Sequence, residues 1–270
     1  MSTLHAMREG QCAASDTWYK LTGDGAGGTL NDFIVPSGIG RAYRLSVSVG
    51  LANTAATGTV LVKLAGTAVP HGSETIAVAG YTGNGNATTL AMDNVEMLID
   101  APLQPGTLEI WGCYSGGDSG TPELMIGVDM DEKKGSAWYI TREGQTGTAD
   151  SWTTLAGTGT GDTNNDPVVP TGASNIVSVI HAVGPGIAAG AATYGARLLS
   201  ISGSMPSGDQ YFVGPSSTAG AGTIADIAVM RGKMNVCQIP VKGGTQIRVQ
   251  AVMSGADQGT PEQAITVVFA

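Results

Sequence analysis

One short stretch of the sequence, SGGDSGTPE at residues 115–123, could carry nucleophilic chemistry. Its Gly-Asp-Ser-Gly core places Ser119 where the nucleophile loop of a serine protease would place it. Such a serine also needs a histidine base, a buried aspartate and an oxyanion hole. The three histidines, His5, His71 and His181, stand in no recognisable catalytic pattern. We therefore predict no catalytic residue and no enzyme activity.

The same stretch occurs again near the end of the chain, as SGADQGTPE at residues 254–262, with Gln258 in place of the serine. Glycine permits positive φ angles, aspartate caps a turn with its side chain, and proline marks where the next strand can begin. We interpret both copies as structural hairpin loops. The residues assigned to these loops are Gly117, Asp118, Gly120, Pro122, Asp257, Gly259 and Pro261.

The repeated loop belongs to a repeat that extends over nearly the whole chain. Arg8-Glu9-Gly10-Gln11 recurs 134 residues later, beginning at Arg142, and the same shift carries Trp18 to Trp152. The shift reaches 139 at the loop, as short insertions in surface turns would cause. A charged, glycine-closed segment stands between the two copies. The sequence therefore predicts a tandem duplication, with domains at 1–131 and 136–270 joined by a linker at 132–135.

Hydrophobic residues alternate with polar ones within each copy. In RLSVSV, Leu45, Val47 and Val49 alternate with serines, and Val177, Val179, His181 and Val183 continue the pattern in the second copy. Period-two alternation predicts strands with one face in a core and the other towards solvent. The further strands expected in the first copy are 17–21, 32–35, 58–65, 74–79, 94–100, 106–114 and 122–130. We predict an all-β fold, a tandem duplication of a jelly-roll-like antiparallel β-sandwich.

Few other residues suggest a binding site. Asp162 and Asp166 in TGDTNNDP are weak candidates for oxygen ligands of Ca²⁺, but the spacing of a calcium-binding loop is absent. His181 takes the repeat position of Val47, which favours a core histidine over a catalytic one. The expectation is therefore a chain without a metal site and without a cofactor.

The composition limits the classes of partner. The formal net charge is −9, and only 13% of the residues are charged. A nucleic-acid-binding protein needs lysine and arginine gathered on one face, and here they are scattered. The sequence also contains no apolar run long enough for a membrane span. We expect neither nucleic acid nor membrane as a partner.

The paired hairpins TLEIWGCYSGGDSGTPELMIGVDMD and TQIRVQAVMSGADQGTPEQAITVVFA, in a Gly/Thr-rich chain, give it a resemblance to viral jelly-roll virion proteins. The chain resembles in particular the cement or decoration proteins of tailed phages. That resemblance implies a structural role on the outside of a viral shell, without catalytic residues. Two alternatives stay open: a double-jelly-roll major capsid protein, and a carbohydrate- or receptor-binding module of a fibre.

The resemblance also implies partners and a location. The expected partners are capsid proteins, and the chain would be made in the host cytoplasm and placed on the capsid exterior. Duplication presents any self-association surface twice, so we expect a homo-oligomer. A trimer would form a ring of six similar domains.

Overall fold

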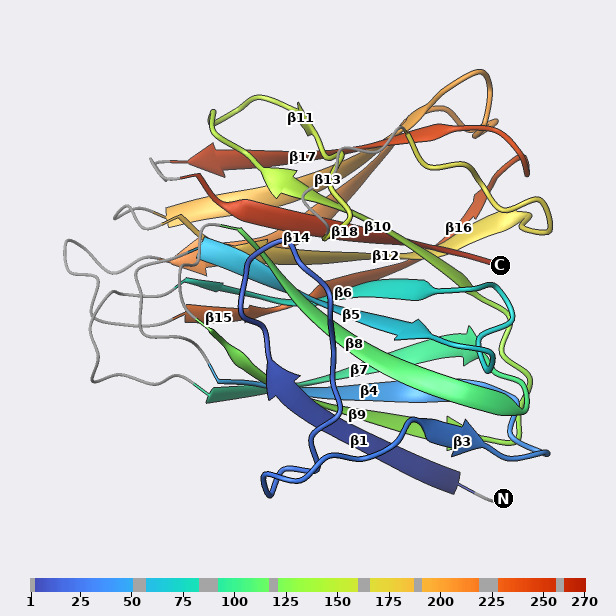
Figure 1. Cartoon of the computed structure of the whole chain (residues 1–270). Helices are drawn as coiled ribbons and strands as arrows, with labels where there is room; N and C mark the ends of the chain where they lie inside the picture. The colour runs from blue at the N-terminus through green and yellow to red at the C-terminus, as the bar shows by residue number, and fades with distance from the viewer. Residues whose placement is uncertain are drawn as a thin grey trace.

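The structure is a computed structural model that describes residues 3–50, 57–82, 92–116, 121–159, 166–186, 191–218, 228–255 and 260–270. Its regular elements are β-strands, β1 to β18, which run roughly along one direction in layers (Figure 1). None of the described residues forms a helix that could cross a membrane.

The first half of the chain contains nine of these strands: β1 (Thr3–Gln11), β2 (Tyr19–Lys20), β3 (Phe33–Val35), β4 (Arg41–Gly50), β5 (Thr57–Ala65), β6 (Glu74–Thr82), β7 (Met92–Pro102), β8 (Gly106–Gly116) and β9 (Glu123–Asp131). The second half contains β10 (Trp138–Gln145), β11 (Thr153–Thr154), β12 (Asn175–Gly184), β13 (Ala191–Ser200), β14 (Gln210–Thr218), β15 (Ala228–Arg231), β16 (Lys233–Pro240), β17 (Ile247–Gly255) and β18 (Glu262–Phe269).

The two halves have the same strand order. In the first half, one sheet has the order β1-β9-β4-β7 and the facing sheet contains β2-β8-β5-β6. The corresponding sheets of the second half are β10-β18-β12-β16 and β11-β17-β13-β14. If β3 and β15 are left out, eight strands remain in each half, and they can be counted from one to eight in chain order. One sheet of each half then has the order 1-8-3-6, and the other has the order 2-7-4-5. This arrangement is the jelly roll. The predicted all-β fold, a duplicated jelly-roll sandwich, is confirmed.

The expected strands of the first copy all have counterparts, but β1 was not expected. The inward positions of β1 include Ala6, Arg8 and Gly10, which do not form an apolar stripe. Arg8 is nonetheless buried, because its guanidinium donates to the carbonyl oxygens of Met7 and Asn31. A strand whose inner face includes a charged residue gives no alternation signal.

The four sheets are stacked as four layers (Figure 1). The β2-β8-β5-β6 sheet of the first sandwich packs on the β10-β18-β12-β16 sheet of the second, with β6 against β12 and β10. In β4, the valines point into the core while Ser46 and Ser48 lie on the outer face. In β12, Ile180 and Ala182 are fully buried on the equivalent outer face. The expectation that β12 has one solvent face was therefore wrong, because the first sandwich covers it.

The contact between the sandwiches is built from small side chains and hydrogen bonds. The backbone amide of Tyr139 donates to Glu74 Oε2 at 2.7 Å, and the amide of Ala77 donates to Thr266 Oγ1 at 2.8 Å. These bonds satisfy polar groups that the contact removes from water. The buried apolar centre of the contact consists of Leu61, Ala77, Cys113, Ala182 and Ala264.

One strand crosses between the halves. β15 comes from the second half but pairs antiparallel with β6 of the first, with Met230 opposite Gly80. A two-domain interpretation of the sequence does not anticipate this exchange. β15 extends the first sandwich's sheet and ties the two halves together by backbone hydrogen bonds.

Candidate functional site

The repeated loops begin and end in the same way in both halves. Each follows a glycine with φ of 124°, Gly116 in the first half and Gly255 in the second. The carbonyl oxygens of Pro122 and Pro261 each accept a backbone hydrogen bond of 3.0 Å, from Cys12 and Thr146 respectively. The assigned loop residues Gly117, Asp118, Gly120, Asp257 and Gly259, together with Ser119, lie outside the described residues.

Of the two calcium candidates, the structure describes only Asp166. Asp162 lies outside the described residues. Asp166 forms a bidentate pair with Arg248, at 3.0 Å from Nε and 2.9 Å from one terminal nitrogen. Both carboxylate oxygens of Asp166 are thus engaged by a cation. Among the described residues, no group of three acidic, histidine or cysteine side chains is placed to hold a metal ion.

His181 lies in the core of the second sandwich and is fully buried. Its Nε2 is 2.8 Å from Gln263 Oε1, and Gln263 Nε2 donates to Thr146 Oγ1 at 2.7 Å. Nδ1 has no hydrogen-bond partner among the described residues. Burial lowers the pKa of His181 to about 4, so the ring is neutral at neutral pH.

We predict that the buried, neutral His181 lowers the free energy of unfolding of the protein in acid. His181 takes up a proton near pH 6.5 in the unfolded chain, but only near pH 4 in the folded chain. Stability is therefore present above pH 6.5 and is lost as the pH falls towards 4. The repeat counterparts of His181 and Gln263 are the apolar Val47 and Leu124.

The double variant H181V/Q263L should remove this acid sensitivity. H181V alone should cost about 1–3 kcal/mol at pH 7, because it leaves the buried Gln263 oxygen without a partner. Urea unfolding at pH 5 and pH 7 measures both effects. An unchanged loss of stability at pH 5 in the double variant would show that another group titrates.

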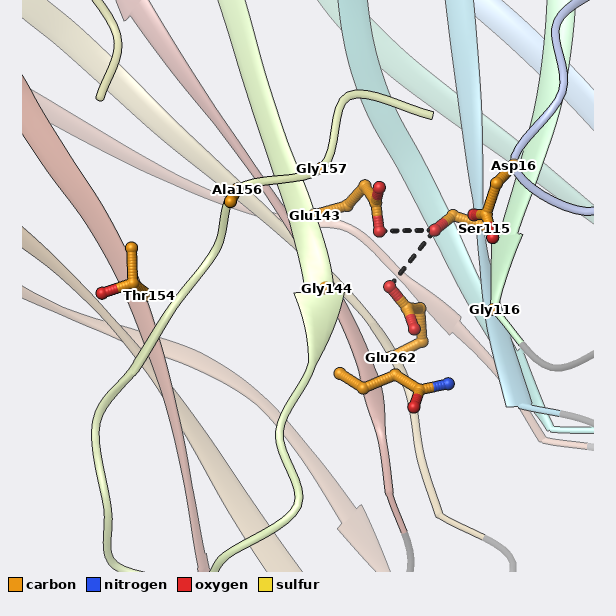
Figure 2. Close-up of a pocket in the computed structure, with 10 residues that line it drawn as sticks. Asp16, Ser115, Gly116, Glu143, Gly144, Thr154, Ala156, Gly157 and Glu262 are labelled. Atoms are coloured by element: carbon orange, nitrogen blue, oxygen red, sulfur yellow. Dashed lines mark hydrogen bonds between the residues drawn. The ribbon is translucent and has the colours of Figure 1, made fainter. Parts of the chain in front are cut away.

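A cluster of carboxyl groups lies where the two sandwiches meet (Figure 2). Ser115, at the end of β8, lies 2.6 Å from Glu143 Oε2 on β10 and 3.2 Å from Glu262 Oε1 on β18. Asp16, before β2, lines the same hollow of about 310 Å³. The backbone amide of Gly159 donates to the other Glu143 oxygen at 3.3 Å. Both halves of the chain are needed to form this cluster.

The cluster holds a proton at neutral pH. Burial first, and then hydrogen bonding to Glu143, raises the pKa of Glu262 to about 10. The Ser115 hydroxyl has one hydrogen and can donate to only one of the two carboxyls. Glu143 accepts hydrogen bonds from the Ser115 hydroxyl and the Gly159 amide, and protonated Glu262 can donate within the cluster. Burial, with the nearby charge of Glu143, also raises the pKa of Asp16.

The sequence analysis missed this cluster, although a signal was present. Glu143 and Glu262 repeat Glu9 and Glu123, within the Arg-Glu-Gly-Gln and Gly-Thr-Pro-Glu repeats. In the first sandwich, a hydrogen bond to Glu9 raises the pKa of Glu123. The glutamates were thus visible as a repeated pair, but their contact with Ser115 depends on how the sandwiches dock.

The aromatic residues that hold repeat positions have different surroundings. Trp18 lies in the contact between the sandwiches, where its indole donates to the Thr158 carbonyl at 3.3 Å. Trp152 lies on the outer face of the second sandwich, with the Arg197 guanidinium 4.6 Å from its ring and Tyr211 edge-on at 5.9 Å. Tyr211 is 62% exposed. This outer face is the uncovered counterpart of the face on which the second sandwich docks.

No model of a protein family and no curated protein matches the chain. Among solved structures, the chain is similar to the major capsid protein P2 of bacteriophage PM2, with 9% identity, a TM-score of 0.35, and coverage of 99% of this chain and 97% of that one. It is also similar to the tandem CBM22 domain of Paenibacillus barcinonensis Xyn10C, with 10% identity, a TM-score of 0.25, and coverage of 99% and 93%.

A third similar structure is the T13 viral particle of IBDV, with 11% identity, a TM-score of 0.24, and coverage of 99% of this chain and 69% of that one. The fold assignment rests on the strand order of the four sheets.

Proposed function

We propose that this chain is a structural protein of a virion, a double jelly roll that serves as a building block of a viral shell. The observation that carries the proposal is the joining of two jelly rolls of the same strand order by a buried, hydrogen-bonded contact. Jelly rolls are a recurrent fold of viral capsid proteins. A shell needs blocks of fixed shape, because the angles between neighbouring domains set its curvature.

The geometry supports the role of a major capsid protein more than that of a cement protein. The sequence resemblance favours a cement protein on the capsid exterior. A cement protein need only fit an existing lattice, and its domains can be joined loosely. Here β15 pairs across the halves and Glu74, 1% exposed, accepts a hydrogen bond from the other sandwich. Such coupling serves a chain whose two domains occupy fixed places in a lattice.

The proposed partners are other copies of the chain and other capsid proteins. Three copies would supply six jelly rolls of one strand order, which suits a ring with near-sixfold symmetry. A net charge of −9 keeps free subunits apart from the phosphates of nucleic acid, so contact with the genome is not part of the proposal. The proposal places the protein in the virion after synthesis in the host cytoplasm.

The proposal assigns no catalytic activity to the chain. Ser115, the hydroxyl of the carboxylate cluster, is fully buried by the second sandwich. The surroundings of Trp152 count against the alternative role of a glycan-binding fibre module. The Arg197 guanidinium lies over the Trp152 ring, on a face that a sugar ring would need for stacking.

Light scattering and electron microscopy of the purified protein test this proposal. We expect a defined oligomer, most simply a trimer, that forms closed or sheet-like lattices at high protein concentration. A strict monomer that forms no lattice, alone or with capsids of candidate viruses, would contradict the proposal.

A further inference from the structure

In the part of the chain that the structure describes, two sheet faces of the four-layer stack are not packed against another sheet (Figure 1). One is the outer face of β1-β9-β4-β7, here called the front face, and the other is the outer face of β11-β17-β13-β14, here called the back face. By the repeat, the front face corresponds to the second sandwich's side of the internal contact. The back face corresponds to the first sandwich's side of that contact.

The front face carries repeat counterparts of the residues that the second sandwich contributes to the carboxylate cluster. The Glu143 side chain lies against Gly157, where an added Cβ would be 1.8 Å from its Oε1. Glu9 lies in the same way against Gly23, where an added Cβ would be 1.9 Å from its Oε1. The backbone pairing of glutamate and glycine is also the same in both halves. The front face therefore presents this half in the geometry that the internal contact uses.

The back face keeps the first sandwich's half. Asp16 and Asp150 both have positive φ, 53° and 58°, and their amides donate to the carbonyls of Tyr114 and Met253. Ser254 is the repeat counterpart of Ser115. It is exposed, and its hydroxyl donates to Asp150 Oδ1 at 2.5 Å. The serine that meets two glutamates inside the chain thus has a copy on the back face.

The aromatic part of the contact is also retained. Inside the chain, Gly159 lies over Trp18, with an added Cβ 3.2 Å from the ring. The counterparts are Gly25 on the loop beside the front face and Trp152 on the back face. Gly25 and Gly159 have nearly the same φ, 79° and 76°. Both partners of this contact are therefore displayed on opposite ends of the stack.

We propose that the front face of one chain binds the back face of a second copy of this chain, head to tail, as a variant of the internal contact. Glu9 and Glu123 would meet Ser254 of the second copy, and the Gly25 loop would cover Trp152. The occupant is a second copy because both halves of one known contact are present on the free faces. This inference deepens the proposed function and rests on it for its biological setting.

The new contact cannot superpose on the internal one. Gly80 allows close backbone approach inside the chain, but its counterpart is Ser216. On β14, Tyr211 also replaces the smaller Thr75. These enlargements lie on the β13–β14 side, whereas the retained residues lie on the β11–β17 side. In the second contact, the two chains must therefore lie farther apart along β14 than the two sandwiches do along β6. Each chain is then tilted relative to the next, and the same tilt at every contact favours a closed ring over a straight stack.

Complementation between blocked faces tests the head-to-tail contact. S48W places a large side chain on the front face, at the counterpart of Ala182, and S254W does so on the back face. S37W, in the exposed turn between β3 and β4, is the matched control. Sedimentation velocity is measured for each protein alone and for a mixture of S48W and S254W. A second pair, M125R and T193R, guards against misfolding of one variant.

We expect each blocked variant to sediment as a single chain, the mixture to form a pair but nothing larger, and S37W to behave as the native protein. Persistence of the native oligomer in both variants would overturn the head-to-tail contact and leave the proposed function standing. A native protein that stays a single chain at all concentrations would also overturn it. Pair formation in the mixture, together with a native protein that forms no lattice, would keep the contact and count against the role in a shell.

Discussion

Replacement of Gly80 by alanine is expected to lower the free energy of unfolding by about 3 kcal/mol, near the upper end of the usual cost of overpacking. A Cβ at this position would lie 1.7 Å from the Val183 carbonyl oxygen and 2.3 Å from the Gly184 nitrogen. Backbone atoms cannot move aside as the end of a flexible side chain can. The two sandwiches would have to separate locally, with loss of nearby hydrogen bonds.

Thermal and urea unfolding measure this effect, with G147A as the matched control. Gly147 is exposed, and an added Cβ would lie 3.8 Å from a methyl group of Thr260, an ordinary van der Waals contact. The control should change the free energy of unfolding by less than about 0.5 kcal/mol. A G80A variant as stable as the control would show that the sandwiches do not pack as described.

Replacement of Glu262 by glutamine is expected to stabilise the protein at alkaline pH. The pKa of Glu262 in the folded protein is about 10, against the ordinary glutamate pKa of 4.5 in the unfolded chain. The unfolded chain therefore releases this proton above pH 4.5, while the folded chain keeps it. Stability from this group is complete below pH 4.5 and is lost as the pH rises towards 10.

Glutamine resembles the protonated acid and has no proton to lose. The difference in free energy of unfolding between E262Q and the native protein should grow by about 1 kcal/mol per pH unit between pH 5 and pH 8. E123Q is the matched control, because Glu123 is the repeat counterpart on the uncovered front face. Denaturant unfolding across this range, with parallel curves for E262Q and the native protein, would exclude a protonated Glu262.

The duplication and the jelly-roll strands could be predicted because they leave local patterns. The alternation of Leu45 and Val47 with Ser46 and Ser48 marks one buried face. The four-layer stack also had a signal, since the outer positions of β12 hold Ile180 and Ala182 in place of those serines. Apolar residues on both faces of a strand indicate that both faces are covered.

The candidate site could be predicted only in part. The repeat displays Glu143 and Glu262 as a pair, but their burial beside Ser115 depends on the angle at which the sandwiches dock. That angle follows from close backbone approach at Gly80 and from β15, which pairs with a sheet of the other half. Such long-range contacts have no periodic signature in the sequence.

The central claim is that two jelly rolls, locked as one block, assemble into a viral shell. Cryo-electron microscopy of the oligomer formed by the purified protein tests it most directly. We expect a closed ring of six sandwiches from three chains, with the β5–β6 face of each first sandwich still packed on β12 of the same chain. Particles in which the two sandwiches of a chain are separated, or a monomer at every concentration, would contradict it.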